Sequence, residues 1–216
     1  MKYSLIIFDC DGVLVDSENV IPHVETRLIN ETGLSITFDE LRALLKGKQV
    51  KDIKPIMLAR GVNVPDEWLY DLAMATAFSL HTDLKAISGV NEVLELLSNM
   101  NMPICVASQS PYWRLRLSLS LTNLDKFFEG NFFCSSMVSR GKPAPDLFLY
   151  AADNFHVAPK DCLVIEDTPT GVRAAKAAGM EVFGYAADHS AEELESAGAK
   201  VFTNMLELPN LIGLDL

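Results

Sequence analysis

Long hydrophobic runs are absent from this sequence of 216 residues. No segment approaches the roughly 18 consecutive apolar residues that a membrane-spanning helix needs, so we expect no such helix. The first apolar run, Leu5–Phe8, is closed by Asp9 and Asp11 and is too short for the core of a secretory signal peptide. We therefore expect a protein that enters neither the membrane nor the secretory pathway.

Cysteine is scarce as well. The four cysteines are Cys10, Cys105, Cys134 and Cys162. They are far apart and form no C-x-x-C pair, which argues against a zinc site. Three of them lie in apolar runs typical of strands, where a thiol behaves as a small hydrophobic group. This usage predicts reduced thiols and a cytoplasmic protein.

Basic residues are the third deficit, because 18 Lys and Arg stand against 29 Asp and Glu and give a formal net charge of -11. Such a chain repels nucleic acids and anionic membranes, so neither is an expected partner. The excess acid is either solvated surface or, in part, a carboxylate site that needs a cation. A hydrophobic content of 49% excludes a disordered chain. The length suits one compact domain, or one domain with an insert.

Short apolar runs recur along the chain and predict the buried strands of a parallel sheet. The predicted strands are Leu5–Phe8, Ile104–Ala107, Phe132–Cys134, Leu163–Ile165, Val182–Tyr185 and Val201–Phe202. Between most of them lie stretches with helical spacing. One amphipathic stripe is formed by Val90, Val93, Leu94 and Leu97, and another by Leu147, Phe148, Ala151 and Ala152. A third helical stretch, with Val172, Ala175, Lys176 and Gly179, follows the strand at Ile165, and Gly179 suits a helix C-terminus. This alternation predicts an α/β fold with a doubly wound parallel sheet.

A long interval without strands follows the first strand. Segments that look helical fill it, namely Val20–Asn30, Phe38–Leu45, Val50–Arg60 and Glu67–Leu84. A helical block of this size indicates an inserted domain. We predict a catalytic core made of residues 1–16 and 86–216, and a helical domain made of residues 17–85.

Reactive side chains follow the predicted strands, where the ligands of open parallel sheets bind. They are Asp9 and Asp11 after the first strand, Ser108 after the second, Glu166 and Asp167 after the fourth, and Lys142 just before a helix. Four carboxylates in one crevice repel each other unless a cation joins them. Ligand sets made only of oxygen suit Mg²⁺, which often serves phosphate chemistry. The sequence therefore predicts a magnesium site.

The same residue types suit phosphoryl transfer. Asp9 would attack phosphorus and form an aspartyl phosphate. Asp11 would protonate the leaving oxygen and later deprotonate water. Ser108 and Lys142 would bind the anionic phosphoryl group. Positioning and charge neutralisation, which this reaction mainly requires, are what such a set supplies.

Four segments resemble, in order and with similar spacing, the motifs of haloacid dehalogenase-like phosphohydrolases that carry a small helical cap after the first strand. The segments are Phe8–Glu18 (FDCDGVLVDSE), Val106–Ser108 (VAS), Gly141–Asp146 (GKPAPD) and Val164–Gly171 (VIEDTPTG). The resemblance extends over nearly the whole chain. It implies a Rossmann-like core with an inserted cap, and hydrolysis of phosphoric monoesters.

The resemblance also implies roles for the acidic residues. Asp9 is the nucleophile and a Mg²⁺ ligand, and Asp11 is the general acid and base, whose main-chain carbonyl also reaches the metal. Asp167 is a metal ligand, and Glu166 binds the metal directly or through water. The aspartate at position 11 favours phosphate esters over halo-acids, since the dehalogenase members lack it.

Further substrate contacts are expected from two places. Gln109 stands where many relatives carry Asn or a small residue, and we include it among the phosphate-binding residues. Five basic residues and one acid lie between positions 42 and 54, and the loop Leu45–Gln49 resembles a cap loop that reads the substrate. We hypothesise that Lys46 contacts the leaving group of the substrate, with Lys48 and Gln49 as weaker candidates.

The predicted function is Mg²⁺-dependent hydrolysis of a small phosphorylated metabolite, of the sugar or sugar-acid phosphate class. One alternative is a β-phosphoglucomutase-type phosphotransferase, although those mutases usually carry histidine and arginine where this chain has Ile21 and Val50. Phosphonoacetaldehyde hydrolase is a further relative, whose Schiff-base lysine would match Lys46 or Lys51.

An alternative of another class is a noncatalytic phospho-receiver. Receivers, however, place their phosphorylated aspartate on a later strand and lack a helical insert.

Overall fold

The computed structural model describes residues 2–45, 52–186 and 190–214. The chain divides into two compact units, Met1–Asp16 with Lys85–Leu216, and Ser17–Leu84. The division thus falls before Lys85, whereas the boundary drawn from the sequence falls after it. Lys85 belongs with the first unit because its carbonyl accepts a hydrogen bond of 2.9 Å from the N–H of Asp16.

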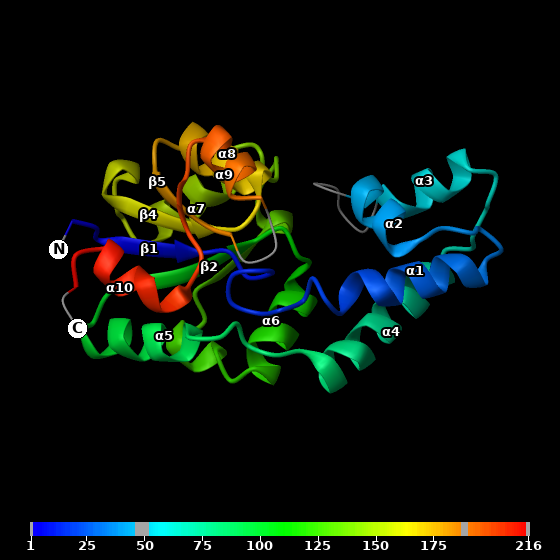
Figure 1. Cartoon of the computed structure of the whole chain (residues 1–216), viewed down its shortest axis with the longest axis horizontal. Coiled ribbons are helices and arrows are strands. Elements are labelled where there is room, and N and C mark those ends of the chain that lie inside the picture. The colour runs from blue at the N-terminus through cyan, green and yellow to red at the C-terminus, as the bar shows by residue number, and fades with distance from the viewer. Residues whose placement is uncertain (1, 46–51, 187–189, 215–216) are drawn as a thin grey trace. The chain divides into compact units, whose positions relative to one another are not determined.

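Six parallel strands form one sheet in the first unit (Figure 1). They are β1 (Leu5–Phe8), β2 (Ile104–Ser108), β3 (Phe132–Cys134), β4 (Cys162–Glu166), β5 (Glu181–Tyr185) and β6 (Lys200–Phe202). All six predicted strands are confirmed, with small shifts of their ends. The spatial order is β3-β2-β1-β4-β5-β6, so the direction of winding reverses between β1 and β4. A reversal of this kind opens a crevice at the carboxyl ends of the two strands.

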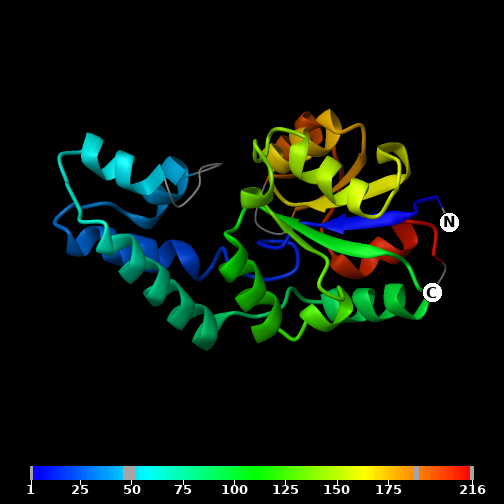
Figure 2. The same ribbon diagram turned by 180° about the vertical axis from the view of Figure 1, so that it is seen from behind.

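Helices cover both faces of the sheet (Figures 1 and 2). One face carries α7 (Asp146–Asn154), α8 (Pro169–Ala177) and α9 (Ala191–Ala197), and the other carries α5 (Val90–Asn99), α6 (Tyr112–Leu121) and α10 (Leu208–Leu211). Short 3-10 helices lie at Asp125–Phe127, Ser135–Met137, Pro159–Asp161 and Met205–Glu207. The strands β1, β2 and β4 bury every residue between the two layers of helices, which explains their continuous apolar runs.

The apolar stripes of the helices face the sheet largely as their spacing predicts. The stripes of α5 and α7 are confirmed residue by residue. In α8 the buried residues are Gly171, Val172, Ala174 and Ala175. Lys176 of the same helix is exposed, since a lysine keeps its charge in water. Gly179 has a φ of +76° just after α8, as expected of a glycine that ends a helix.

The second unit is built from helices. They are α1 (Ile21–Glu31), α2 (Phe38–Leu45), α3 (Ile53–Ala59) and α4 (Glu67–Asp83). Each contributes to one apolar cluster, for example through Ile29, Leu41, Met57 and Leu72. This unit therefore has a hydrophobic core of its own, as a separate domain requires.

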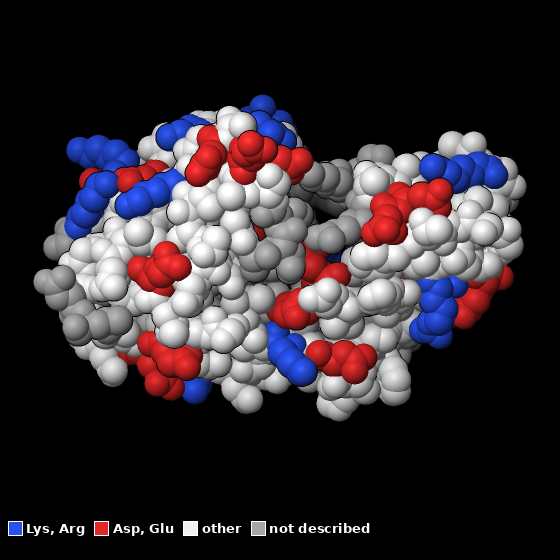
Figure 3. All heavy atoms as spheres, viewed as in Figure 1, with Lys and Arg blue, Asp and Glu red and all other residues white. Residues whose placement is uncertain are grey.

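Charge is mixed on the surface. On the face drawn in Figure 3, acidic and basic side chains lie among broad uncharged areas. The acidic groups on this face are distributed in several places, which agrees with a solvated surface as the main use of the excess acid. Within the described part of the chain, the helices fall short of the length and hydrophobicity needed to cross a bilayer.

Leu94 of α5 is fully buried, and we expect Leu94→Ala to lower the free energy of unfolding by about 2–5 kcal/mol. The truncation removes apolar contacts and leaves a cavity that its neighbours fill only in part. Urea denaturation of the two proteins measures the difference. The matched control is Glu95→Ala at the next, exposed position, which should stay within about 0.5 kcal/mol of wild type. Equal losses in both variants would contradict this orientation of α5.

Candidate active site

The ammonium group of Lys142 joins three strand ends. Its Nζ donates to Asp9 Oδ1 after β1 (2.8 Å), to Glu166 Oε1 at the end of β4 (2.7 Å) and to the carbonyl oxygen of Ala107 in β2 (2.9 Å). A lysine has three N–H donors, so these contacts use all of them. The side chain is 2% exposed, and the ring of Phe148 lies 4.8 Å from Nζ. The turn before α7 thus delivers one fixed positive charge to the crevice between β1 and β4.

Burial and charge oppose each other in this pocket. Burial alone would lower the pKa of Lys142, but the carboxylates of Asp9 and Glu166 outweigh it and raise the pKa. Burial raises the pKa of Asp9 to about 7; the charge of Lys142 acts against this rise, while the charges of Glu166 and Asp11 add to it. The pocket therefore disfavours the ionised form of Asp9 unless more positive charge is supplied.

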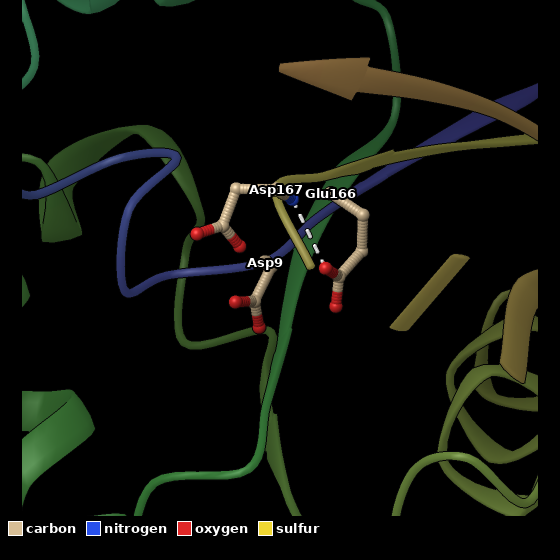
Figure 4. A group of neighbouring side chains, drawn as sticks. All are labelled: Asp9, Glu166 and Asp167. Carbon is tan, nitrogen blue, oxygen red and sulfur yellow. Dashed lines mark hydrogen bonds between the residues drawn. The ribbon is translucent and has the colours of Figure 1, made fainter. Parts of the chain in front are cut away.

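Asp9, Glu166 and Asp167 turn their carboxyl groups toward one another (Figure 4). One oxygen from each lies within 4.8 Å of the others, and all three residues are buried. Three carboxylates face one ammonium here, so negative charge is in excess and its burial is costly. A hard divalent cation with oxygen ligands relieves this cost. The cluster therefore fits Mg²⁺.

Glu166 is held by hydrogen bonds at both oxygens. Its Oε2 accepts from the N–H of Asp167 (3.0 Å, dashed in Figure 4) and from the N–H and the hydroxyl of Thr168 (both 2.9 Å), while Oε1 accepts from Lys142. Gly171 in the first turn of α8 packs against the same carboxylate, and a Cβ there would lie 1.7 Å from Oε1. The backbone thus locks Glu166 in the position from which it holds the ammonium of Lys142.

Gly12 makes room for Asp167. A Cβ on Gly12 would lie 2.1 Å from Asp167 Oδ2, and the φ of Gly12 is +77°, a conformation that favours glycine. The glycine that follows Asp11 therefore shapes the acidic cluster by leaving space in it.

The carboxylate of Asp11 has other partners. Its Oδ2 accepts a hydrogen bond from the hydroxyl of Ser110, and Arg114 Nη2 lies 3.8 Å from the same oxygen. The acidic cluster contains the carboxylates of three other residues, and the expected metal ligand of Asp11 is its main-chain carbonyl. Our sequence analysis missed both Ser110 and Arg114. The one sequence feature that indicates them is their spacing of four residues shortly after Ser108, which places both on one side of a helix start.

Ser108 and Gln109 differ in their surroundings. Ser108 is buried, and its hydroxyl oxygen accepts from the N–H of Ser110 (3.0 Å), so its own proton can still be donated. Gln109 Oε1 accepts from the N–H of Lys142 (3.1 Å), and its Nε2 donates to the Lys142 carbonyl (3.4 Å). The Gln109 amide thus pairs with the main chain of the turn that carries Lys142.

The remaining predicted contact, Lys46, lies outside the described residues. The same is true of Lys48, Gln49, Val50 and Lys51.

Comparison with known proteins agrees with this fold. The model of the haloacid dehalogenase-like hydrolase family matches residues 6–185. The 6-phosphogluconate phosphatase of Escherichia coli is 30% identical over 214 residues, which are 97% of this chain and 95% of that protein.

Solved structures agree with this fold over nearly the whole chain. A haloacid dehalogenase-like protein from Agrobacterium tumefaciens has 35% identity and a TM-score of 0.80, and the match covers 97% of each chain. A HAD family hydrolase from Deinococcus radiodurans, with bound phosphate and sodium, has 30% identity and a TM-score of 0.80 over 98% of this chain and 95% of that one. Sequence, fold and the order of the site segments together show that this chain belongs to the haloacid dehalogenase-like hydrolases.

Proposed function

We propose that the chain is a Mg²⁺-dependent phosphatase that hydrolyses a small phosphorylated metabolite through an aspartyl-phosphate intermediate. The observation that carries the proposal is the cluster of three buried carboxylates, those of Asp9, Glu166 and Asp167, of which Asp9 and Glu166 contact Lys142. The 6-phosphogluconate phosphatase relative supports a substrate of the sugar or sugar-acid phosphate class. The phosphate bound in the Deinococcus relative supports a phosphoryl site.

Asp9, Asp167 and the main-chain carbonyl of Asp11 would hold Mg²⁺. Glu166 would reach it through a water molecule, because both of its oxygens already accept hydrogen bonds. Bound Mg²⁺ supplies positive charge that neutralises phosphoryl oxygens and stabilises the ionised form of Asp9.

In the first step a carboxylate oxygen of Asp9 attacks phosphorus, and the bond from phosphorus to the leaving oxygen breaks. The leaving oxygen keeps the bonding electrons and takes a proton from Asp11. Ser108 donates its hydroxyl proton to a phosphoryl oxygen. Lys142 contributes its charge and exchanges one of its present hydrogen bonds for the phosphoryl group. Gln109 holds the Lys142 turn in place.

In the second step water attacks the phosphorus of the aspartyl phosphate. Asp11, now ionised, takes a proton from this water. The bond from phosphorus to the Asp9 oxygen breaks, its electrons return to Asp9, and inorganic phosphate leaves. Because Asp9 is buried, access of other water to the intermediate is restricted.

The unit Ser17–Leu84 would act as a cap that selects the substrate, in keeping with the family resemblance. We propose that Lys46 of this unit contacts the leaving group of the substrate.

We propose that the protein works in the cytoplasm as a monomer. Four free, buried cysteines support a reducing location. Ile21, apolar and buried in α1, stands where related mutases carry histidine and favours water as the acceptor.

The purified protein should release phosphate steadily from p-nitrophenyl phosphate with Mg²⁺ and stop when EDTA is added. Asp9→Asn should lower kcat by at least about 10³-fold, because an amide is a poor nucleophile. Asp11→Asn should lower it by about 10²–10⁴-fold, because an amide cannot exchange the proton. Asp153→Asn, on the exposed side of α7, is the control and should keep wild-type activity.

A substrate panel then separates the alternatives. It contains 6-phosphogluconate, hexose 6-phosphates, β-glucose 1-phosphate and phosphonoacetaldehyde. Near-full activity of Asp9→Asn would exclude the covalent mechanism. A single stoichiometric phosphorylation without turnover would favour a phospho-receiver. Conversion of β-glucose 1-phosphate to the 6-phosphate, without release of phosphate, would favour a mutase.

Asp167→Asn should raise the Mg²⁺ concentration for half-maximal activity at least about tenfold, because it replaces a charged ligand with a neutral one. The increase in melting temperature that Mg²⁺ produces in the wild type should shrink in parallel. Asp153→Asn again serves as the control. An unchanged Mg²⁺ dependence in Asp167→Asn would remove this residue from the ligand set.

Asp9→Asn should stabilise the metal-free protein at pH 8. Burial raises the pKa of Asp9 to about 7, so the stability contributed by its protonated form is present below about pH 4 and is lost as the pH rises through about 7. Asparagine does not titrate, so we expect its free energy of unfolding in EDTA at pH 8 to exceed that of wild type by about 0.5–2 kcal/mol. Urea denaturation should give a smaller difference at pH 5. A difference that does not grow with pH would contradict this view of Asp9.

A further inference from the structure

Asp11 is the end of a short chain of hydrogen bonds that includes Ser110 and Arg114. The Ser110 hydroxyl donates to Asp11 Oδ2. Arg114 donates to the Ser110 hydroxyl oxygen twice, from Nη2 at 2.8 Å and from Nε at 3.2 Å. Ser110 is 2% exposed, and the side chains of Arg114 and Asp11 are 14% and 20% exposed, so water has limited access to this chain.

The chemistry of the three groups sets the direction of these bonds. A guanidinium group can only donate, and a hydroxyl has one proton and two lone pairs. Because Arg114 occupies both lone pairs of the Ser110 oxygen, the proton of Ser110 is left for Asp11. Asp11 Oδ2 is therefore an acceptor, and when Asp11 is protonated its proton resides on Oδ1.

Local structure holds this arrangement in place. Ser110 precedes α6 and Arg114 lies in its first turn, so the two are one helical turn apart. The N–H of Ser110 donates to Ser108 Oγ (3.0 Å), and the N–H of Arg114 donates to the Pro111 carbonyl (3.0 Å). The position of Asp11 is thereby tied to the end of β2, where the phosphoryl-binding serine lies.

We infer that Ser110 and Arg114 are positioning residues that orient Asp11 so that its Oδ1 exchanges the proton of the reaction. This inference rests on the proposed phosphatase function and adds the groups that orient its acid and base. In the first step the proton passes from Asp11 Oδ1 to the leaving oxygen, which keeps the electrons of the broken bond to phosphorus. In the second step Oδ1 recovers a proton from the attacking water. The Ser110 proton and the Arg114 charge stay in place throughout.

The test compares two aryl phosphates that differ in how much their leaving group needs a proton. Dinitrophenolate leaves without one, whereas the phenolate of phenyl phosphate needs one. Arg114→Ala and Ser110→Ala should each lower kcat/KM for phenyl phosphate by about 10²-fold more than for 2,4-dinitrophenyl phosphate, since general acid catalysis contributes on this scale. Asp11→Asn removes the acid itself and so gives the largest expected difference between the losses on the two esters. The double variant should lose no more kcat/KM than the more impaired of the two single variants, because both residues act through one oxygen.

Arg116→Ala is the matched control, since Arg116 lies on the same helix with its guanidinium 5.2 Å from the centre of the Phe132 ring. It should leave both rates unchanged. Should Arg114→Ala unfold, Ser110→Ala decides the matter, because it removes only one oxygen. Equal losses of kcat/KM on both esters, or losses that multiply in the double variant, would overturn the positioning role of Ser110 and Arg114. The phosphatase proposal would not be affected by that result. A wild type that hydrolyses neither ester with Mg²⁺ would instead overturn the phosphatase proposal, and this inference with it.

Discussion

The contact of the Lys142 ammonium with Asp9 and Glu166 is the interaction on which the rest of the site depends. It brings together the ends of strands that are widely separated in the sequence, and it does so out of contact with water. Buried carboxylates repel each other, so Asp9 and Glu166 tolerate this proximity only with a cation between them. Asp167 adds negative charge that Lys142 does not balance. The same interaction thus stabilises the crevice and leaves it suited to a divalent cation.

The sheet explains why the crevice lies where it does. β1 is central and pairs with β2 on one side and β4 on the other, so the residues after these three strands emerge at one edge. Two glycines then allow the acidic side chains to approach the backbone, Gly12 beside Asp167 and Gly171 beside Glu166. The positions of the carboxylates therefore depend on regular elements and on missing Cβ atoms as much as on the acidic residues themselves.

Two aspartates only two positions apart have separate supporting groups. Asp9 is buried against Lys142, whereas Asp11 is partly exposed and interacts with Ser110 and Arg114. The proposed nucleophile and the proposed proton carrier need different surroundings, because the first must be ionised when it attacks and the second must gain and lose a proton.

The strands, most helical faces and the residue types of the site follow from the amino-acid pattern alone. Buried parallel strands require continuous apolar runs, and the reactive residues directly follow them, so their spacing was readable. The pairing of Gln109 with the Lys142 turn, and the hydrogen bonds from Ser110 to Asp11 and from Arg114 to Ser110, became visible only in the folded chain. These features depend on side-chain direction and hydrogen-bond geometry between segments far apart in the chain, which the pattern of residue types does not encode.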